Sequence, residues 1–460
     1  MDTRDTINPA GMLSGVEAAV RAAAAPDRQR LDDILGRAAG LEGVTLGDAA
    51  SLLKIEDRED AARLFRAAGR VKERVFGPRV VLFAPLYLSN HCANDCLYCG
   101  FRRSSEVAAR RALSVDEAVE QARHLSSRGF KRILLVAGEH PAYSGVEYLE
   151  EAASAIYSKT DIRILHVNCA PLATDGFRRL KAAGYGVYQC FQETYHRDTY
   201  ARVHPSGKKR DYGFRLEAMD RALEAGFGDV GIGALLGLYD YAFDALAAIA
   251  HSRRLEERFG AAAHTISVPR LRHAEGAALT EPPYPVTGFE FKKIVAVYRL
   301  CVPYAGVVVS TREPASLREE ALDCGASQIS AGSSTEPGGY GPGEHSTAQF
   351  DVTDLRGLPE MMAVIARKGL LPSLCTSCYR SGRQGEEFRE LASTGAMREF
   401  CTPNAILSLR EFMRDNPDEG LNGLLERTVE RFSGEVDEPL RRDLMDKLGR
   451  TARGERDLHY

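Results

Sequence analysis

The cysteines of this chain are spaced in ways that suit iron–sulfur chemistry. Cys92, Cys96 and Cys99 follow the pattern Cys-x3-Cys-x2-Cys. Three thiolates this close together can ligate three irons of a 4Fe–4S cluster and leave the fourth iron open. A structural zinc site is the alternative, but zinc normally takes four protein ligands, and His91 would have to be the fourth. The aromatic Tyr98 and the position of the loop after an apolar run favour the cluster.

An open iron suits one cofactor in particular. S-adenosylmethionine (SAM) can chelate it through an amine and a carboxylate, and an electron from the cluster then releases a 5′-deoxyadenosyl radical. The first cysteine group therefore predicts radical SAM chemistry.

A second group lies near the C-terminus, as Cys375-x2-Cys378-x22-Cys401. Cys-x2-Cys alone would favour a zinc clip between helices, but the distant third cysteine in FCTPNA favours a second iron–sulfur site. The other four cysteines stand alone and are expected to be small buried apolar residues: Cys169, Cys190, Cys301 and Cys324.

Strand and helix patterns alternate through the middle of the chain. Residues 12–76 are typical of amphipathic helices. Eight short β-branched runs follow, at 80–87, 132–137, 162–168, 185–191, 229–236, 264–269, 305–310 and 327–332. Helical patterns between them predict a (β/α)8 TIM barrel, with a doubly wound open sheet as the alternative. We expect an N-terminal helical segment at 1–78, the barrel at 79–343 and a mostly helical C-terminal iron–sulfur extension at 344–460.

Polar residues follow most of the predicted strands. In such barrels, catalytic groups gather at the C-terminal ends of the strands. The strand ends carry the first cysteine loop, Gly138-Glu139-His140, Asn168-Cys169, Gln192-Glu193-Thr194, Arg270 and Ser310-Thr311-Arg312. This repetition predicts an active site at one mouth of the barrel.

Composition excludes several classes of protein. The 460 residues are 44% hydrophobic and 27% charged, with a formal net charge of −4, so nothing favours nucleic acid or an anionic membrane surface. No apolar stretch reaches the roughly 18 residues that cross a bilayer, and the charged N-terminus does not look like a secretory signal. We expect a cytoplasmic protein that binds neither membranes nor nucleic acid.

Three motifs carry a resemblance to a known family. CANDCLYCGF, AGEH and FQETYH resemble the aromatic-amino-acid lyases of the radical SAM superfamily. The resemblance implies that Glu139, with Gly138, faces the SAM amino group, and that Glu193, with Gln192 beside it, faces the ribose hydroxyls. It also implies that Arg215 pairs with the SAM carboxylate, and it adds Tyr98 to the cofactor-binding residues. A simple cluster carrier would have no use for these residues.

The C-terminal cysteines divide this family further. Their spacing is similar to that of the FeFe-hydrogenase maturases, whereas tyrosine lyases of thiazole synthesis, the alternative, are not expected to have them. The resemblance implies that L-tyrosine is cleaved to p-cresol and dehydroglycine, which becomes CO and cyanide on the second cluster. It also implies an extra iron there, bridged by an amino acid such as free cysteine. His264 is the expected ligand of that iron, ahead of His273, since imidazole suits ferrous iron.

The substrate and partners follow from the same resemblance. The tyrosine carboxylate needs a cationic clamp, for which Arg270, Ser310 and Arg312 lie at suitable strand ends. A reductant such as flavodoxin or ferredoxin and other hydrogenase maturases are the expected protein partners. A passage between the two clusters would have to open through a barrel that is normally packed solid.

Overall fold

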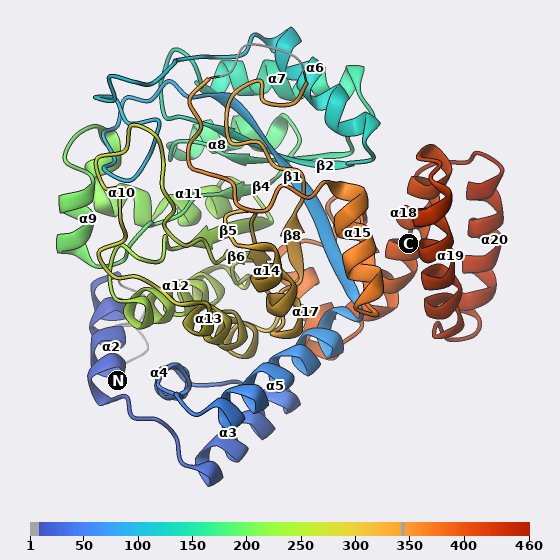
Figure 1. Cartoon of the computed structure of the whole chain (residues 1–460), viewed down its shortest axis with the longest axis horizontal. Coiled ribbons are helices and arrows are strands. Elements are labelled where there is room, and N and C mark those ends of the chain that lie inside the picture. Colours follow the sequence, from blue (N-terminus) through green and yellow to red (C-terminus); the bar gives the residue numbers. More distant parts are fainter. Residues whose placement is uncertain (1–8, 342–345) are drawn as a thin grey trace.

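Parallel strands surround the centre of the molecule (Figure 1). In the computed structural model, which describes residues 9–341 and 346–460, eight of them close into a barrel because β1 pairs with both β8 and β2. The strands are β1 (Arg79–Ser89), β2 (Arg132–Ala137), β3 (Ile164–Asn168), β4 (Tyr185–Gln189), β5 (Asp229–Gly233), β6 (Thr265–Ser267), β7 (Gly306–Val309), β8 (Gln328–Ser330) and β9 (Leu371–Ser373). The predicted barrel is confirmed.

The short strand β9 was not predicted from the sequence. Val81 of β1 is in register with Gln328 of β8 and also with Ser373 of β9, so β9 lies on the opposite side of β1 from β8. β2 pairs further along that same side of β1, so β9 and β2 follow one another. Three residues with a proline give little strand signal, and Pro372 is tolerated because β9 is an edge strand.

Helices cover the barrel and extend it at both termini. The N-terminal helices are α2 (Pro9–Ala22), α3 (Arg28–Gly40), α4 (Leu46–Leu53) and α5 (Arg58–Phe76). Those of the barrel are α6 (Val115–Ser127), α7 (Val146–Lys159), α8 (Thr174–Ala182), α9 (Arg197–Val203), η1 (Lys208–Arg210), α10 (Tyr212–Leu216), α11 (Ala218–Glu224), α12 (Tyr241–Phe259), α13 (Gly288–Cys301) and α14 (Ala315–Asp323). Side-chain caps begin several of them, for example the reciprocal Ser114–Glu117 capping box of α6.

The C-terminal region is mostly helical, as predicted. Its helices are α15 (Leu358–Arg367), α16 (Ser377–Arg380), α17 (Gly385–Thr394), α18 (Met397–Asp415), α19 (Glu419–Gly434) and α20 (Leu440–Ala452). The last three form a layer at one side of the barrel (Figure 1). The predicted boundary between residues 343 and 344 lies outside the described residues. No helix in the described part of the chain combines the length and apolar character needed to cross a membrane.

Candidate functional site

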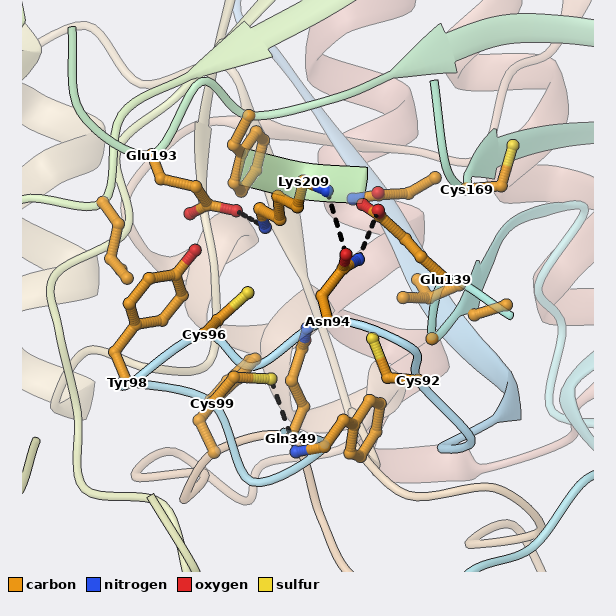
Figure 2. A pocket seen from close by; sticks show the side chains of 18 of the residues that line it. Cys92, Asn94, Cys96, Tyr98, Cys99, Glu139, Cys169, Glu193, Lys209 and Gln349 are labelled. Carbon is orange, nitrogen blue, oxygen red and sulfur yellow. Dashed lines mark hydrogen bonds and ion pairs between the residues drawn. The ribbon is translucent and has the colours of Figure 1, made fainter. Parts of the chain in front are cut away.

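The first cysteine group occupies the loop after β1, at the C-terminal mouth of the barrel. Backbone hydrogen bonds attach this loop to three other segments: Ala93 N donates to Glu139 O at 2.9 Å, Leu97 N to Val203 O at 3.0 Å and Gly100 N to Gln349 O at 3.2 Å. The side chains of Cys92, Cys96 and Cys99 line one cavity, called the first cavity below (Figure 2). The structure thus brings all three predicted ligands together.

Two glycines allow neighbouring loops to approach the cysteine loop. A Cβ atom on Gly138 would lie 2.4 Å from His91 O. On Gly207, with φ +88°, it would lie 2.3 Å from Asn94 Oδ1. Neither position leaves room for a side chain, so these glycines permit the close packing around the first cavity.

Opposite the thiols lies a buried network of charges (Figure 2). Arg215 Nη1 donates to Glu139 Oε1 at 2.9 Å, and Asn94 Nδ2 donates to Glu139 Oε2 at 2.7 Å. Lys209 Nζ lies 2.7 Å from Glu193 Oε1, which is 3.5 Å from Arg215 Nη2. Burial raises the pKa of Glu139, but Arg215 and Lys209 outweigh burial and hold that pKa below its usual value. The carboxylate therefore stays ionised, as binding to an ammonium group requires.

Glu193 also has an unusual backbone. Its φ of +70° is in the left-handed region, which a non-glycine residue occupies at a cost of about 1–2 kcal/mol. Such strain is typical of functional sites, where surrounding contacts hold it in place. Here Leu235 N donates to Glu193 O at 2.7 Å.

The other predicted cofactor residues differ in their placement. Tyr98 lines the first cavity, and its hydroxyl donates to His204 Nε2 at 2.8 Å, because His204 Nδ1 faces Tyr200 O at 2.8 Å. The side chain of Gln192 does not line this cavity, whereas its neighbours Phe191 and Glu193 do. Gln192 instead lies between two residues whose side chains enter the cavity, and its backbone N donates to Gly233 O at 3.0 Å.

A second space, the barrel cavity, lies within the strands. Phe83, Leu134, Gln189, Ser267, Val308 and Ser330 are among its lining residues. It adjoins the first cavity, since both are lined by Val136, Asn168, Phe191, Arg312, Gln349 and Phe350. Ser310 also lines the barrel cavity, and Tyr87 donates to Gln349 Oε1 there at 2.7 Å.

The two predicted substrate arginines have different surroundings. The guanidinium of Arg312 packs over the Phe350 ring, 3.3 Å from its centroid, and no acidic side chain within residues 9–341 and 346–460 forms an ion pair with it. Arg270 lines neither cavity and instead binds Glu313 at 2.8 Å through Nε. The structure therefore brings Ser310 and Arg312 together without Arg270.

The second cysteine group lies at the other end of the barrel. Cys375 follows β9, Cys378 lies on α16 and Cys401 on α18, and all three line what we call the second cavity. Arg79 and Arg132, at the starts of β1 and β2, line it too. Arg132 Nη2 donates to Cys375 O at 2.8 Å.

His264 joins the second cavity from the start of β6. Its Nε2 lies 3.0 Å from the hydroxyl of Tyr379, and its Nδ1 lies 3.2 Å from Asp229 Oδ1, without hydrogen-bond alignment. A carboxylate behind a histidine is the arrangement that orients histidine ligands in metal sites. His273 lies elsewhere, exposed and 2.8 Å from Asp351 Oδ2.

The two thiol sets suit iron–sulfur clusters. Burial raises the pKa of Cys99 to about 11 and of Cys378 to about 12, so without metal these thiols keep their protons. Coordination removes those protons, and three thiolates leave one cluster iron open. Within the described residues, no three His, Cys, Asp or Glu side chains are placed to hold a single metal ion.

Sequence reasoning missed two members of the charge network, Asn94 and Lys209. Asn94 lies between the first two cysteines, and Lys209 is in the basic run GKKR. The position of Asn94 inside the motif was a usable signal. Lys209 offered none, because its neighbours Lys208 and Arg210 are equally basic.

Known proteins resemble this chain over most of its length. Residues 86–250 match the family model "Radical SAM superfamily", and residues 267–371 match "Biotin and Thiamin Synthesis associated domain". The 2-iminoacetate synthase of Escherichia coli (strain K12) is 33% identical over 337 residues, which span 73% of this chain and 88% of that enzyme.

Two solved structures match almost completely. A crystal structure of HydG, a maturase of the FeFe-hydrogenase, has a TM-score of 0.93 and 41% identity, covering 99% of this chain and 100% of that one. HydG from Carboxydothermus hydrogenoformans has a TM-score of 0.85 and 39% identity, covering 96% and 99%. The chain is therefore a radical SAM lyase, a class that uses a 4Fe–4S cluster and SAM, and it belongs to the family of the 2-iminoacetate synthases and HydG maturases.

Proposed function

We propose that this lyase cleaves L-tyrosine to p-cresol and 2-iminoacetate (dehydroglycine), and converts the latter into CO and cyanide for FeFe-hydrogenase maturation. The observation that carries the proposal is the presence of two three-cysteine cavities at opposite ends of one barrel. The names of the relatives support the two halves separately: one makes 2-iminoacetate, and the others are maturases of the FeFe-hydrogenase.

The first cavity would hold the cluster and SAM. Cys92, Cys96 and Cys99 would ligate three irons. When bound, the cluster and SAM supply a 5′-deoxyadenosyl radical. Glu139 offers an ionised carboxylate to the SAM amine, and Gly138 lies beside it. Glu193, with Gln192 next to it in the chain, suits the ribose hydroxyls.

Arg215 has a shared role in this cavity. It binds Glu139 directly, so it orients the carboxylate that faces the SAM amine, and its remaining charge suits the SAM carboxylate. Tyr98 closes the cavity beside the cysteines, held by His204.

The barrel cavity suits tyrosine. Arg312, which forms no ion pair with an acidic side chain in the described part of the chain, provides a guanidinium for the substrate carboxylate, and Ser310 adds a hydroxyl. Apolar side chains such as Phe83, Leu134 and Val308 suit the aromatic ring. Because this cavity adjoins the first one, a bound tyrosine amine can lie close to SAM.

The barrel cavity and the second cavity are one layer of side chains apart. On three neighbouring strands, the residues that line the second cavity and the barrel cavity are two positions apart: Val81 and Phe83, Arg132 and Leu134, Gln328 and Ser330. Two positions span about 6.6 Å on one face of a strand. A small rearrangement would therefore let 2-iminoacetate pass.

The second cavity would hold the auxiliary 4Fe–4S cluster on Cys375, Cys378 and Cys401. His264, backed by Asp229, would ligate an extra iron, which a free cysteine could bridge to the cluster. A reductant such as flavodoxin or ferredoxin and the other hydrogenase maturases would be the protein partners. The alternative, a lyase that releases dehydroglycine for thiazole synthesis, gives the second cysteine cavity no role.

Anaerobic reconstitution tests the proposal. The protein should bind about eight or nine irons, as two 4Fe–4S clusters with or without the extra iron, and with SAM, tyrosine and dithionite it should form p-cresol and CO. Cys96→Ala should abolish SAM cleavage and every product. Cys324→Ala should not, because this buried thiol lines neither the first nor the second cavity. Tyrosine cleavage without CO from fully loaded protein would favour the thiazole-type lyase instead.

A further inference from the structure

We propose that Arg132 and His166, on the neighbouring strands β2 and β3, form a carboxylate-binding site at the floor of the barrel. The site would receive the small acid released in the barrel cavity and hold it beside the second cavity. This inference rests on the proposed function, whose product 2-iminoacetate is a carboxylate.

Arg132 is a buried cation that lines the second cavity. The residue is only 7% exposed. In the described part of the chain, no group forms a hydrogen bond with its Nε, and no carboxylate forms an ion pair with its guanidinium. Its Nη2 donates to Cys375 O, a neutral carbonyl, so the charge of the guanidinium is not balanced by this contact.

Two other cations at the starts of these strands do have acidic partners. Lys131, just before β2, is paired with Asp161, and Arg163, just before β3, is paired with Glu411. Burying a guanidinium without a carboxylate beside it is costly, so the retention of Arg132 at the edge of the second cavity indicates an anionic ligand.

His166 is a second buried polar group next to Arg132, because both side chains pack on Tyr379. The residue is 5% exposed, and none of the described residues forms a hydrogen bond with its Nε2. Both side chains pack on the ring of Tyr379: the His166 ring centroid lies 4.9 Å and the Arg132 guanidinium carbon 5.0 Å from its centroid. The unused nitrogens therefore belong to two side chains that meet on one ring.

The location suits a molecule leaving the barrel. Arg132 lines the second cavity, and Leu134, two positions along β2, lines the barrel cavity. His166 is in register with Leu134, and Asn168, two positions further along β3, lines the barrel cavity. A carboxylate moving from the barrel cavity toward the second cavity would thus pass this pair. The planar guanidinium can bind it through two parallel hydrogen bonds, and the imidazole can add a third.

Equilibrium binding tests the site without turnover. Glyoxylate, the oxygen analogue of 2-iminoacetate, would be titrated calorimetrically into protein loaded with both clusters. SAM and tyrosine would saturate the first cavity and the barrel cavity, and no reductant would be present. Arg132→Gln and His166→Phe should each weaken glyoxylate binding at least tenfold. Arg132→Lys should weaken it by a smaller factor. Lys131→Gln is the matched control, because this adjacent cation already has an acidic partner. The glyoxylate affinity of this variant should equal that of the unchanged protein.

Turnover gives a second readout. Arg132→Gln should form p-cresol at a rate within about twofold of the unchanged protein. It should lose most CO and release glyoxylate, which forms when escaped 2-iminoacetate is hydrolysed. Iron content and the electron paramagnetic resonance (EPR) spectrum should stay the same. Unchanged glyoxylate affinity, or loss of about four irons in both Arg132→Lys and His166→Phe, would overturn the assignment. Absence of CO from the unchanged protein would count against the proposed function instead.

Discussion

The hydroxyl of Tyr379 lies 3.0 Å from Nε2 of His264, although 115 residues separate them in the chain. Tyr379 directly follows Cys378, so this contact places the histidine against the second cysteine group. The imidazole nitrogen next to Tyr379, Nε2, is the one that would face an iron. Asp229 lies beside the other nitrogen, Nδ1.

If His264 ligates the extra iron, His264→Asn should keep both 4Fe–4S clusters and form p-cresol but lose most CO. Asparagine is similar in size but a poor iron ligand, so packing is nearly preserved. Iron analysis should give one iron fewer, and EPR should lack the high-spin signal of a cluster-linked iron. His273→Asn, at an exposed histidine, is the control. Survival of both the signal and CO would make His264 structural.

Replacing Cys375 and Cys378 with alanine should leave p-cresol formation largely intact while CO disappears. The lyase step needs only the first cavity, and these cysteines line the second one. The two products would be measured in the same reaction, with iron content alongside. If p-cresol and CO decline in parallel, the division of labour between the two ends of the barrel is wrong.

Lys209→Gln should weaken SAM binding by tenfold or more. The ammonium is within 2.7 Å of Glu193 Oε1, and breaking a buried ion pair on one side costs about 3–5 kcal/mol. The affinity would be measured by titrating SAM into the loaded protein, where iron content should not change. Lys208→Gln provides the control, because Lys208 is exposed and adjacent. Equal affinities in the two variants would remove Lys209 from the SAM site.

Arg312→Gln should raise the KM for tyrosine about 10- to 100-fold, since a hydrogen bond to a charged group contributes about 1.5–3 kcal/mol. SAM binding should be retained. Arg270→Gln should instead lower stability with little effect on this KM, because it leaves the fully buried Glu313 with Arg272 as its remaining ion-pair partner. Steady-state kinetics and thermal unfolding separate the two effects. A larger KM effect from Arg270 would reverse the assignment.

Asp244 should make stability depend on pH. Burial raises the pKa of its carboxyl from 3.8 to about 7, even though Tyr195 N and Thr194 Oγ1 donate to it. The folded state therefore binds the extra proton, and stability should fall as pH rises from about 4 to 7, by at most about 1.4 kcal/mol per pH unit. Asp244→Asn lacks this titration, so its melting temperature should exceed that of the unchanged protein increasingly up to pH 7–8. A difference that stays constant from pH 5 to 8 would contradict this.

Local sequence was sufficient for the features that depend on neighbouring residues. The spacing of Cys92, Cys96 and Cys99 places three thiols in one loop whatever surrounds it. The alternation of β-branched runs with helical patterns predicted the barrel, because each βα unit is formed by contacts close in the chain. The carboxylates at strand ends, Glu139 and Glu193, were identifiable for the same reason.

Only the tertiary structure decided which side chains meet. Whether Gln192 or Glu193 faces the cavity depends on the backbone conformation after β4, where Glu193 has a φ of +70°. Arg270 is held by Glu313, 43 residues away. Lys209 and His264 reach their cavities through contacts with distant elements. β9 pairs with the first residues of β1, which β2 leaves unpaired on that side. These outcomes depend on packing between segments that are far apart in the chain. Residue spacing describes only neighbouring positions, so it does not predict such packing.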